Sequence, residues 1–399
     1  MPSTLPEGDP VPASGALPAG ALDGLGGPEF GFYVHVPFCV TRCGYCDFNT
    51  YTATELGPGA SRDSYAETAI QEVRLARRVL GDRDLPVRTV FFGGGTPTLL
   101  PPGELGRILR AIDTEFGLVP GAEVTTESNP ESVDETNLAE LREHGFTRMS
   151  FGMQSAREHV LKVLDRTHTP GRAKQVAAWA RAAGFEHVNL DLIYGTPGES
   201  DDDWRASLES ALEADPDHVS AYALIVEEGT RLAAQVRRGE LAAPDDDAMA
   251  DRYLMADELL GAHGLPWYEI SNWARDEAAR CRHNVLYWTG ANWWGIGPGA
   301  HSHVGGTRWW NVKHPAAYAA RLGEGVTPAY AREVLDDDVR RMERIMLEIR
   351  LAGGCPLDLL DESAVAGLQA QGLLEVTGDR AVLTLKGRLL ADAVVRDLT

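Results

Sequence analysis

The stretch FGFYVHVPFCVTRCGYCDFN, residues 30–49, contains Cys39, Cys43 and Cys46 at the spacing C-x3-C-x2-C. A structural zinc site takes four ligands, usually from paired C-x2-C motifs, and no second pair follows. Thiols that are simply buried would not be expected three together in a loop that carries Gly44. The spacing therefore favours an iron–sulfur cube, in which three thiolates leave one of the four irons open to a substrate or cofactor.

The residues around these cysteines are aromatic or apolar. Tyr33, His35 and Phe38 precede the first cysteine, and Tyr45 comes directly before the third. Such side chains exclude water and tune the reduction potential of a cluster. We therefore expect them to cover the cluster.

Composition limits the classes of function. The chain has 399 residues, 44% hydrophobic and 24% charged, which is ordinary for about two or three globular domains. Its 37 Lys and Arg against 59 Asp and Glu give a net charge of −22, which argues against nucleic-acid and membrane-surface binding. We expect a cytoplasmic protein, because the sequence shows no membrane-length apolar run, no signal peptide, and an odd count of five cysteines.

From about residue 30 to residue 235, apolar strand-like runs alternate with helical patterns. The expected strands are FYVHV, TVFF, AEVTTE, TRMSFGM, HVNLDLIY and HVSAYAL. The alternation predicts an α/β fold with a parallel sheet, and six units fit a partial (β/α)6 barrel. Glycines and polar residues follow the strand ends at residues 93–96 and 127–130, the edge where parallel α/β folds bind ligands.

Three regions differ in composition. Residues 1–28 are rich in Gly, Pro and Ala and are expected to form a flexible lead-in. Residues 29–240 form the predicted barrel, which ends near a polar, Pro-containing stretch. Residues 241–399 are expected to form a helical C-terminal domain whose end, around LLEVTGDRAVLT, is winged-helix-like.

The cysteine loop resembles the signature of the radical S-adenosylmethionine (SAM) superfamily, and GGGTP at residues 93–97 resembles its second motif. Glycines there let backbone groups approach a ligand closely. The resemblance implies a [4Fe-4S] cluster on Cys39, Cys43 and Cys46, with SAM chelated by the open iron. In that superfamily, one electron from the cluster cleaves SAM to a 5′-deoxyadenosyl radical.

The resemblance extends over nearly the whole chain after residue 30. YVHVPFC, FFGGGTPT, TESNP, SFGMQS, NLDLIYGTPGE and GIGPGAH are similar to blocks of the oxygen-independent coproporphyrinogen III oxidase group and of its relative, the haem chaperone family HemW. It implies a SAM site made of Tyr33, Tyr45, Gly94, Gly95, Thr96, Glu127, Gln154, Arg166, Asp191 and His301. Arg166 can pair with a carboxylate, whereas Glu127 and Asp191 can accept hydrogen bonds from hydroxyls or an ammonium.

Two departures from the coproporphyrinogen oxidases favour the HemW family. Those enzymes carry a fourth cysteine two positions after the third, where this chain has Phe48. They also have a longer, ordered N-terminal region that helps to enclose the porphyrinogen, where this chain has the Gly- and Pro-rich lead-in.

A third indication is HNVLYW, residues 283–288, which resembles the HNxxYW motif that is associated with haem in HemW proteins. Imidazole is the commonest haem ligand, and Tyr and Trp can line a porphyrin edge. His283, Tyr287 and Trp288 are therefore candidate haem-binding residues. A histidine beside aromatic residues is also typical of a hydrogen-bonded core, so the ligand stays open; other candidates are Cys281, His301 and His303.

These features predict a haem chaperone that binds haem and delivers it to acceptor haemoproteins, respiratory ones foremost, and that carries a [4Fe-4S] cluster and SAM. One alternative is an oxygen-independent coproporphyrinogen III dehydrogenase, which decarboxylates propionates by hydrogen abstraction. Another is a haem-binding protein that never cleaves SAM. The sequence leaves open whether the chain is an enzyme and whether it forms a homodimer.

Overall fold

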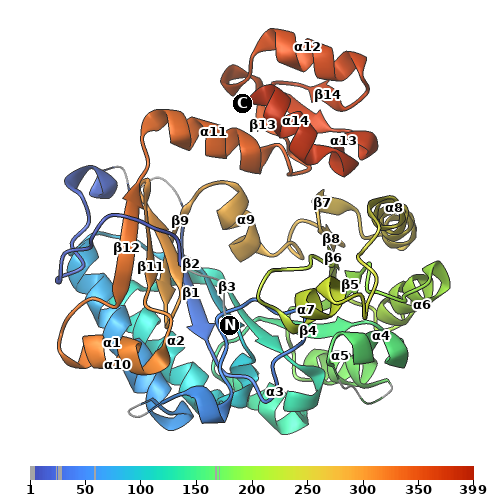
Figure 1. Ribbon diagram of the computed structural model, residues 1–399. Coiled ribbons are helices and arrows are strands. Elements are labelled where there is room, and N and C mark those ends of the chain that lie inside the picture. Colours follow the sequence, from blue (N-terminus) through green and yellow to red (C-terminus); the bar gives the residue numbers. More distant parts are fainter. Residues whose placement is uncertain (1–4, 24, 26–28, 58–59, 167–168, 170) are drawn as a thin grey trace.

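The computed structural model describes residues 5–399 except residues 24, 26–28, 58–59, 167–168 and 170. Among these residues, one sheet of twelve strands runs through most of the molecule, and a sheet of three strands lies in the C-terminal part (Figure 1). The order of the large sheet is β12-β11-β10-β9-β1-β2-β3-β4-β5-β6-β8-β7. Six strands in sequence order therefore form its centre.

The central strands all pair in parallel. They are β1 (Phe30–Val36), β2 (Val87–Gly94), β3 (Leu118–Ser128), β4 (Arg148–Gln154), β5 (His187–Tyr194) and β6 (His218–Ala223). The helices between and after them are α1 (Arg62–Leu80), α2 (Pro102–Phe116), α3 (Glu135–Glu143), α4 (Glu158–Val163), α5 (Arg172–Ala182), α6 (Asp201–Leu212) and α7 (Arg231–Arg237). Each predicted run coincides with one of these strands, so the partial (β/α)6 barrel is confirmed.

Later segments extend this sheet at both edges. β9 (Asn292–Ile296) pairs in parallel with β1, and β10 (His301–Val304), β11 (Thr307–Asn311) and β12 (Ala329–Val334) follow antiparallel. At the other edge lie β8 (Asn272–Ala274) and β7 (Trp267–Glu269). The helices of this region are α8 (Asp246–Ala262), α9 (Arg282–Trp288) and α10 (Pro315–Gly323). The first part of the predicted C-terminal domain thus contributes strands to the barrel sheet.

The end of the chain packs around a core of its own. This part contains α11 (Asp337–Glu348), β13 (Cys355–Pro356), α12 (Glu362–Ala370), β14 (Leu374–Thr377), β15 (Arg380–Leu383), α13 (Leu385–Leu389) and α14 (Ala391–Leu398). Ile345, Leu368 and Val394 are almost fully buried in its core. The stretch LLEVTGDRAVLT forms the hairpin β14–β15, whose strands pair antiparallel.

The described part of the predicted lead-in is bonded to the sheet edge. Asp9 and Arg332 of β12 exchange backbone hydrogen bonds of 2.8 and 2.9 Å, and Thr327 N–H donates to Ala13 C=O at 2.9 Å. The unpaired edge of a sheet offers backbone partners that do not depend on apolar side chains, so low hydrophobicity does not prevent this pairing. Residues 1–4, 24 and 26–28 of the lead-in lie outside the described residues.

Successive side chains of each strand point to opposite faces of the sheet. On β1, Phe32, Val34 and Val36 pack in the main core with the helices, whereas Tyr33 is half-buried on the opposite, concave face. The strand register places on this concave face Thr89, Glu123, Arg148, Asn189 and Ser220. The barrel interior is therefore polar, in contrast to the layer between sheet and helices.

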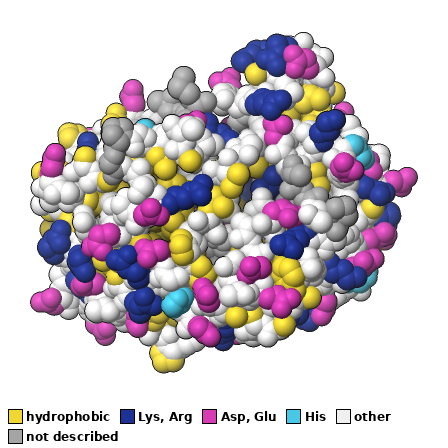
Figure 2. Space-filling model, turned by 90° about the horizontal axis from the view of Figure 1, so that it is seen from below, with side chains coloured by type: hydrophobic (Ala, Val, Ile, Leu, Met, Phe, Trp, Pro, Cys, Tyr) yellow, Lys and Arg dark blue, Asp and Glu magenta, His cyan; other side chains and the backbone are white. Residues whose placement is uncertain are grey.

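Helix α9 lies on the concave face against β1 and β2 (Figure 1). Gly31 makes this approach possible, because a Cβ there would lie 2.7 Å from Leu286 of the helix. Within the described ranges, no helix combines the length and the hydropathy needed to cross a membrane. On the surface that Figure 2 displays, basic and acidic side chains are interspersed.

Glu72 of α1 ties the barrel to the strands that follow α9. Its buried carboxylate accepts hydrogen bonds from Tyr318 OH at 2.5 Å, from Gly297 N–H at 2.8 Å and from Asn311 Nδ2 at 2.8 Å. Gly297 has φ +107°, and a Cβ there would lie 2.4 Å from the carbonyl oxygen of His35. The loop before β10 is thus held close to the end of β1.

Burial raises the pKa of Glu72 from 4.5 to about 7, despite its three donors. The folded state binds this proton more tightly than the unfolded chain does, so its stabilising effect is complete below pH 4.5 and is lost as the pH rises to about 7. We expect Glu72→Gln to reduce the loss of unfolding free energy between pH 5 and pH 7 by about 2 to 3 kcal/mol, measured by denaturant titration. The control Glu67→Gln, on the exposed face of α1, should show the same pH dependence of unfolding free energy as the parent. If Glu72→Gln lost as much unfolding free energy between pH 5 and pH 7 as the parent does, Glu72 would not be the group that titrates there.

Candidate functional site

The cysteine loop follows β1 and is closed by backbone hydrogen bonds. Cys39 N–H donates to Tyr51 C=O at 3.1 Å, and Tyr51 N–H donates to Pro37 C=O at 2.7 Å. Gly44 N–H reaches Leu164 C=O at 3.3 Å, which joins the loop to the end of α4. The three loop cysteines are unpaired and half-buried, so a group that enters the concave face can reach their sulfur atoms.

The chemistry of this donor set fits a cluster. Burial, together with the charges of Cys43 and Cys39, raises the pKa of Cys46 to about 12, so each thiolate disfavours ionisation of the others. Metal binding removes the thiol protons and compensates this repulsion. A cube suits this arrangement, because each thiolate binds an iron of its own.

Arg166 connects the cysteine loop to the end of β4. Its Nη1 lies 3.7 Å from Cys43 Sγ, and its Nη2 donates to Gly152 C=O at 2.9 Å. The Nε atom is buried and has no hydrogen-bond partner among the described residues. The guanidinium therefore retains donor capacity beside the thiols, as a residue that pairs with a carboxylate needs. Tyr45 lies close by, and burial raises the pKa of its hydroxyl.

The GGG turn is bonded to the end of β1. Gly95 N–H donates to Val36 C=O at 2.8 Å, and Thr96 N–H donates to Phe38 C=O at 2.7 Å. Gly94 has φ +105°, and a Cβ there would lie 2.5 Å from the ring of His35. A Cβ on Gly95 would lie 2.4 Å from the carbonyl oxygen of Phe38. Both positions therefore require glycine, which leaves backbone groups exposed to a ligand.

Glu127 and Asp191 form an acidic pair on the concave face. Burial and, to a smaller extent, the charge of Asp191 raise the pKa of Glu127 to about 8, although Gly94 N–H donates a hydrogen bond to its carboxylate at 3.1 Å. Burial also raises the pKa of Asp191, which accepts from Ser150 Oγ at 2.9 Å and from Asn189 Nδ2 at 2.7 Å. A bound cation would favour the ionised form of both carboxylates. The pair thus fits the positively charged SAM.

Gln154, at the end of β4, has φ +64°, which is rare for a residue with a side chain. It lies where the register between β4 and β5 shifts. Its side chain packs close to Gly152, because a Cβ added to that glycine would lie 2.8 Å from Gln154 Nε2. Backbone strain of this kind gathers at ligand sites and is held by surrounding structure. The predicted SAM residues from β1 to β5 thus lie on one face, near the cysteine loop.

His35, which was expected to cover the cluster, and Asn49, for which no role was predicted, connect β1 to the cysteine loop. Tyr33 OH lies 3.0 Å from His35 Nδ1, and His35 Nε2 lies 2.9 Å from Asn49 C=O. Burial lowers the pKa of His35 to about 4, so the ring is neutral, and Asn49 C=O assigns the proton to Nε2. Asn49 Nδ2 donates to Pro298 C=O at 2.9 Å, which links the cysteine loop to the GIGPG turn.

The HNVLYW segment is α9, and a buried carboxylate holds the start of this helix. Glu123 of β3 accepts backbone N–H groups of Arg282 at 3.1 Å and of His283 at 2.9 Å. Arg148 of β4 lies 3.8 Å from the same carboxylate and donates to Ala279 C=O at 2.7 Å. A carboxylate within the apolar strand AEVTTE is a sequence signal for such a partner, of the same kind as Asp191.

His283 lies within the concave face, and both of its ring nitrogens are engaged. Nδ1 lies 2.8 Å from Thr89 Oγ1, and Nε2 lies 2.8 Å from Tyr287 OH. The ring stacks on Phe91 and Tyr33, with centroid distances of 5.3 and 6.4 Å. Burial lowers the pKa of His283 to about 3, so the imidazole is neutral. To coordinate iron through Nε2, His283 must first give up the hydrogen bond between Nε2 and Tyr287 OH.

The remaining haem candidates occupy different environments. Burial raises the pKa of Cys281 to about 12, so it is a thiol beside Glu123. Trp288 is half-buried, and its Nε1 has no hydrogen-bond partner in the part of the chain that the structure describes. His303 Nδ1 lies 2.9 Å from Ala291 C=O, which makes Nε2 the acceptor nitrogen. His301 is exposed, and its ring stacks on Trp310 at 5.8 Å.

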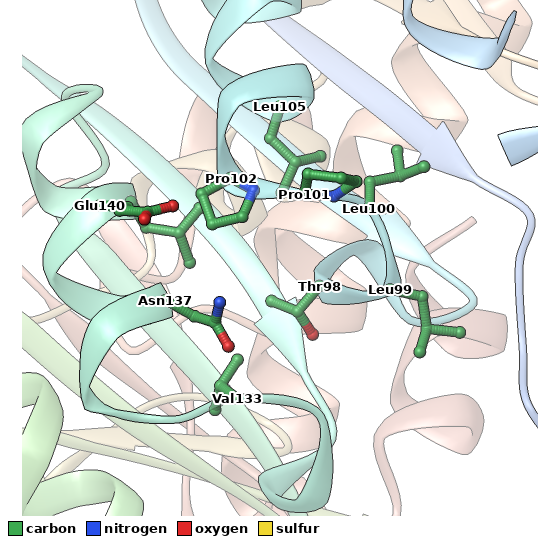
Figure 3. Close-up of a pocket in the computed structure, with 10 residues that line it drawn as sticks. Thr98, Leu99, Leu100, Pro101, Pro102, Leu105, Val133, Asn137 and Glu140 are labelled. Carbon is green, nitrogen blue, oxygen red and sulfur yellow. The ribbon is translucent and has the colours of Figure 1, made fainter. Parts of the chain in front are cut away.

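A cavity of about 420 Å³ lies away from this face, between α2, α3 and the turn η3 (Pro97–Leu99). Its walls are mainly apolar, and Figure 3 shows Asn137 and Glu140 of α3 opposite Pro101 and Pro102. None of the predicted site residues lines it. We therefore assign the functional site to the concave face.

Residues 33–211 match the family model of the radical SAM superfamily. The chain is 54% identical over 376 residues to the heme chaperone HemW of Mycobacterium tuberculosis (strain ATCC 25618 / H37Rv). The alignment covers 93% of this chain and 95% of the relative. It is 32% identical to the heme chaperone HemW of Bacillus subtilis (strain 168), with coverage of 91% and 97%.

Among solved structures, coproporphyrinogen III oxidase (HemN) from Escherichia coli superposes with a TM-score of 0.80, covering 94% of this chain and 91% of that chain. The identity of 23% means that this likeness shows a shared fold. The relatives at 54% and 32% identity, which match over nearly their whole length, decide the family. The chain belongs to the HemW family of the radical SAM superfamily.

Proposed function

We propose that the protein is a haem chaperone that binds haem and delivers it to acceptor haemoproteins, and that it carries a [4Fe-4S] cluster and SAM. The position of α9 carries the proposal: the HNVLYW helix lies on the same concave face as the predicted SAM residues, with His283 stacked against Tyr33. The relatives described above, which are named heme chaperones, support it.

In this proposal, Cys39, Cys43 and Cys46 hold the cluster. When bound, the cluster supplies an electron and an open iron for the amino and carboxylate groups of SAM. Arg166 pairs with a carboxylate, since its guanidinium lies beside the thiols with an unpartnered Nε. Glu127 and Asp191 accept hydrogen bonds, and their paired charge is offset by the cation that they hold.

His283 is the proposed axial ligand of haem. Its ring is neutral, which leaves a lone pair for iron once Tyr287 OH releases Nε2. Tyr287 and Trp288 line the porphyrin, and the flat ring of Phe91 backs the imidazole. The acceptors in this proposal are haemoproteins, respiratory ones foremost. The unpaired state of all five cysteines supports a reducing, cytoplasmic compartment.

The alternative is a coproporphyrinogen III dehydrogenase, for which the shared fold with HemN is the favouring observation. Phe48 stands at the position of the fourth cysteine that the resemblance assigns to those enzymes, and its side chain is 57% exposed. A phenyl ring cannot ligate iron. A third candidate, a haem-binding protein that never cleaves SAM, differs from the first in forming no 5′-deoxyadenosine.

Replacing Cys39, Cys43 or Cys46 with Ala is expected to abolish the brown chromophore, since each supplies one of three thiolates. Anaerobic reconstitution of the parent should give about four irons per chain, and the iron and sulfide contents are both measured. Cys355→Ala, in the C-terminal core, is the matched control and should keep its iron. Stoichiometric zinc without sulfide in the native protein would sink the cluster assignment.

Arg166→Met and Asp191→Asn are expected to weaken SAM binding while leaving the iron content intact. The loss of one charged hydrogen bond costs about 1.5 to 3 kcal/mol, roughly 10- to 150-fold in affinity. Isothermal calorimetry on the reconstituted protein measures this change, with Arg205→Met on the exposed face of α6 as control. Unchanged affinity in either variant removes that residue from the SAM site.

Added haem is expected to give a Soret band that His283→Ala weakens. Tyr287→Phe frees Nε2 and should bind haem at least as tightly as the parent, whereas His263→Ala, exposed at the end of α8, should change nothing. No protoporphyrinogen should form from coproporphyrinogen III with SAM under anaerobic reduction. Robust SAM-dependent decarboxylation would overturn the chaperone proposal in favour of the dehydrogenase, and a Soret band unchanged in His283→Ala would move the ligand elsewhere.

A further inference from the structure

Lys313 lies between β11 and α10 and carries an unusual ammonium group. Its Nζ atom is shielded from solvent and has no hydrogen-bond partner within the described ranges. The chain has 59 Asp and Glu against 37 Lys and Arg, so acidic partners are abundant. A shielded ammonium that none of them satisfies is costly, and an anionic group from outside the chain would remove that cost.

The backbone of Lys313 is fixed to the cysteine loop. Its carbonyl oxygen accepts hydrogen bonds from Asn49 Nδ2 at 2.9 Å and from Tyr51 OH at 3.1 Å. The next residue, His314, caps α10 and lies edge-on to the ring of Tyr51, with centroids 5.4 Å apart. The ammonium is therefore carried by a rigid segment beside the predicted cluster, which reduces the entropy that binding costs.

Two titratable groups interact electrostatically with the ammonium. Asp47 of the cysteine loop attracts it without reaching hydrogen-bond distance, and Lys313 helps burial to lower the pKa of His301 on β10. The ammonium is thus within electrostatic range of both the cysteine loop and β10. His301 is neutral there and provides no counter-charge.

A strip of aromatic side chains runs from the HNVLYW helix to β10, where His301 lies within electrostatic range of Lys313. Tyr287 contacts Trp293 at a centroid distance of 4.7 Å, Trp293 contacts His303 at 5.3 Å, and Trp293 Nε1 donates to the carbonyl oxygen of His301 at 3.0 Å. Trp293 and His303 are half-buried and His301 is exposed, so part of the strip is accessible. A flat apolar surface that ends at a cation suits a flat macrocycle that bears carboxylates at one edge.

We propose that Lys313 binds a propionate carboxylate of haem that lies along this aromatic strip. The proposal rests on the proposed function, in that the chain binds haem. SAM also bears a carboxylate, but Arg166 already stands beside the cysteine loop for that group. The strip begins at the HNVLYW helix, so the propionate is the carboxylate that Lys313 is placed to receive.

The test compares haem with haem dimethyl ester, whose propionates carry no charge, on the reconstituted full-length protein. Lys313→Met is expected to weaken haem binding about tenfold, to leave ester binding unchanged, and to leave SAM affinity and iron content unchanged. Lys313→Arg should restore most of the haem affinity. Lys174→Met, on the exposed surface of α5 with Glu213 as its partner, is the matched control.

Each outcome has one meaning. An equal loss for haem and for the ester, or no loss for haem, overturns the propionate contact while leaving the chaperone proposal intact. A loss of SAM affinity in Lys313→Met, with haem unaffected, assigns the ammonium to the carboxylate of SAM instead. Absence of haem binding by the parent overturns both the proposed function and the propionate site.

Discussion

The site depends on the packing around His35 at the end of β1. The ring is buried and neutral, accepts a hydrogen bond from Tyr33 and donates one to the backbone of the cysteine loop. The backbone carbonyl oxygen of His35 accepts a hydrogen bond from Tyr65 OH of α1 at 2.6 Å. The GGG turn and the GIGPG turn both approach so closely that a Cβ on Gly94 or Gly297 would overlap this residue. One histidine thus sets the relative positions of three loops.

Because those loops meet, the predicted cofactor residues and the haem motif share one face. Tyr33 contacts His35 on one side and stacks on His283 on the other, so one of the predicted SAM residues lies against α9. Glu123 and Arg148, both buried, hold the start of α9 against the strands that carry this face. A ligand on α9 and a cofactor on the cysteine loop would therefore be neighbours, as the proposed function requires.

The sequence predicted the central barrel well, because strand periodicity and cysteine spacing are local signals. The outer strands were missed because β7, β8 and β10 are only 3, 3 and 4 residues long and carry no clear alternation. The lead-in was predicted to be flexible from its side chains, but its described part pairs through the backbone. Only the family resemblance placed Arg166 and His283 in the site. Their partners Cys43 and Thr89 lie 123 and 194 residues away in the chain, so no local pattern in the sequence indicates these contacts. Glu123 could have been found, because a carboxylate inside an apolar strand demands a partner.

Direct transfer of haem tests the central claim most directly. The haem-loaded, cluster-containing protein is mixed with an apo-haemoprotein whose activity returns only with haem, and the recovery rate is compared with that from free haem and from haem-loaded serum albumin. The account predicts recovery that saturates with acceptor concentration and exceeds the rate at which haem dissociates passively from the chaperone. Recovery limited to that passive rate, whatever the acceptor concentration, would contradict it.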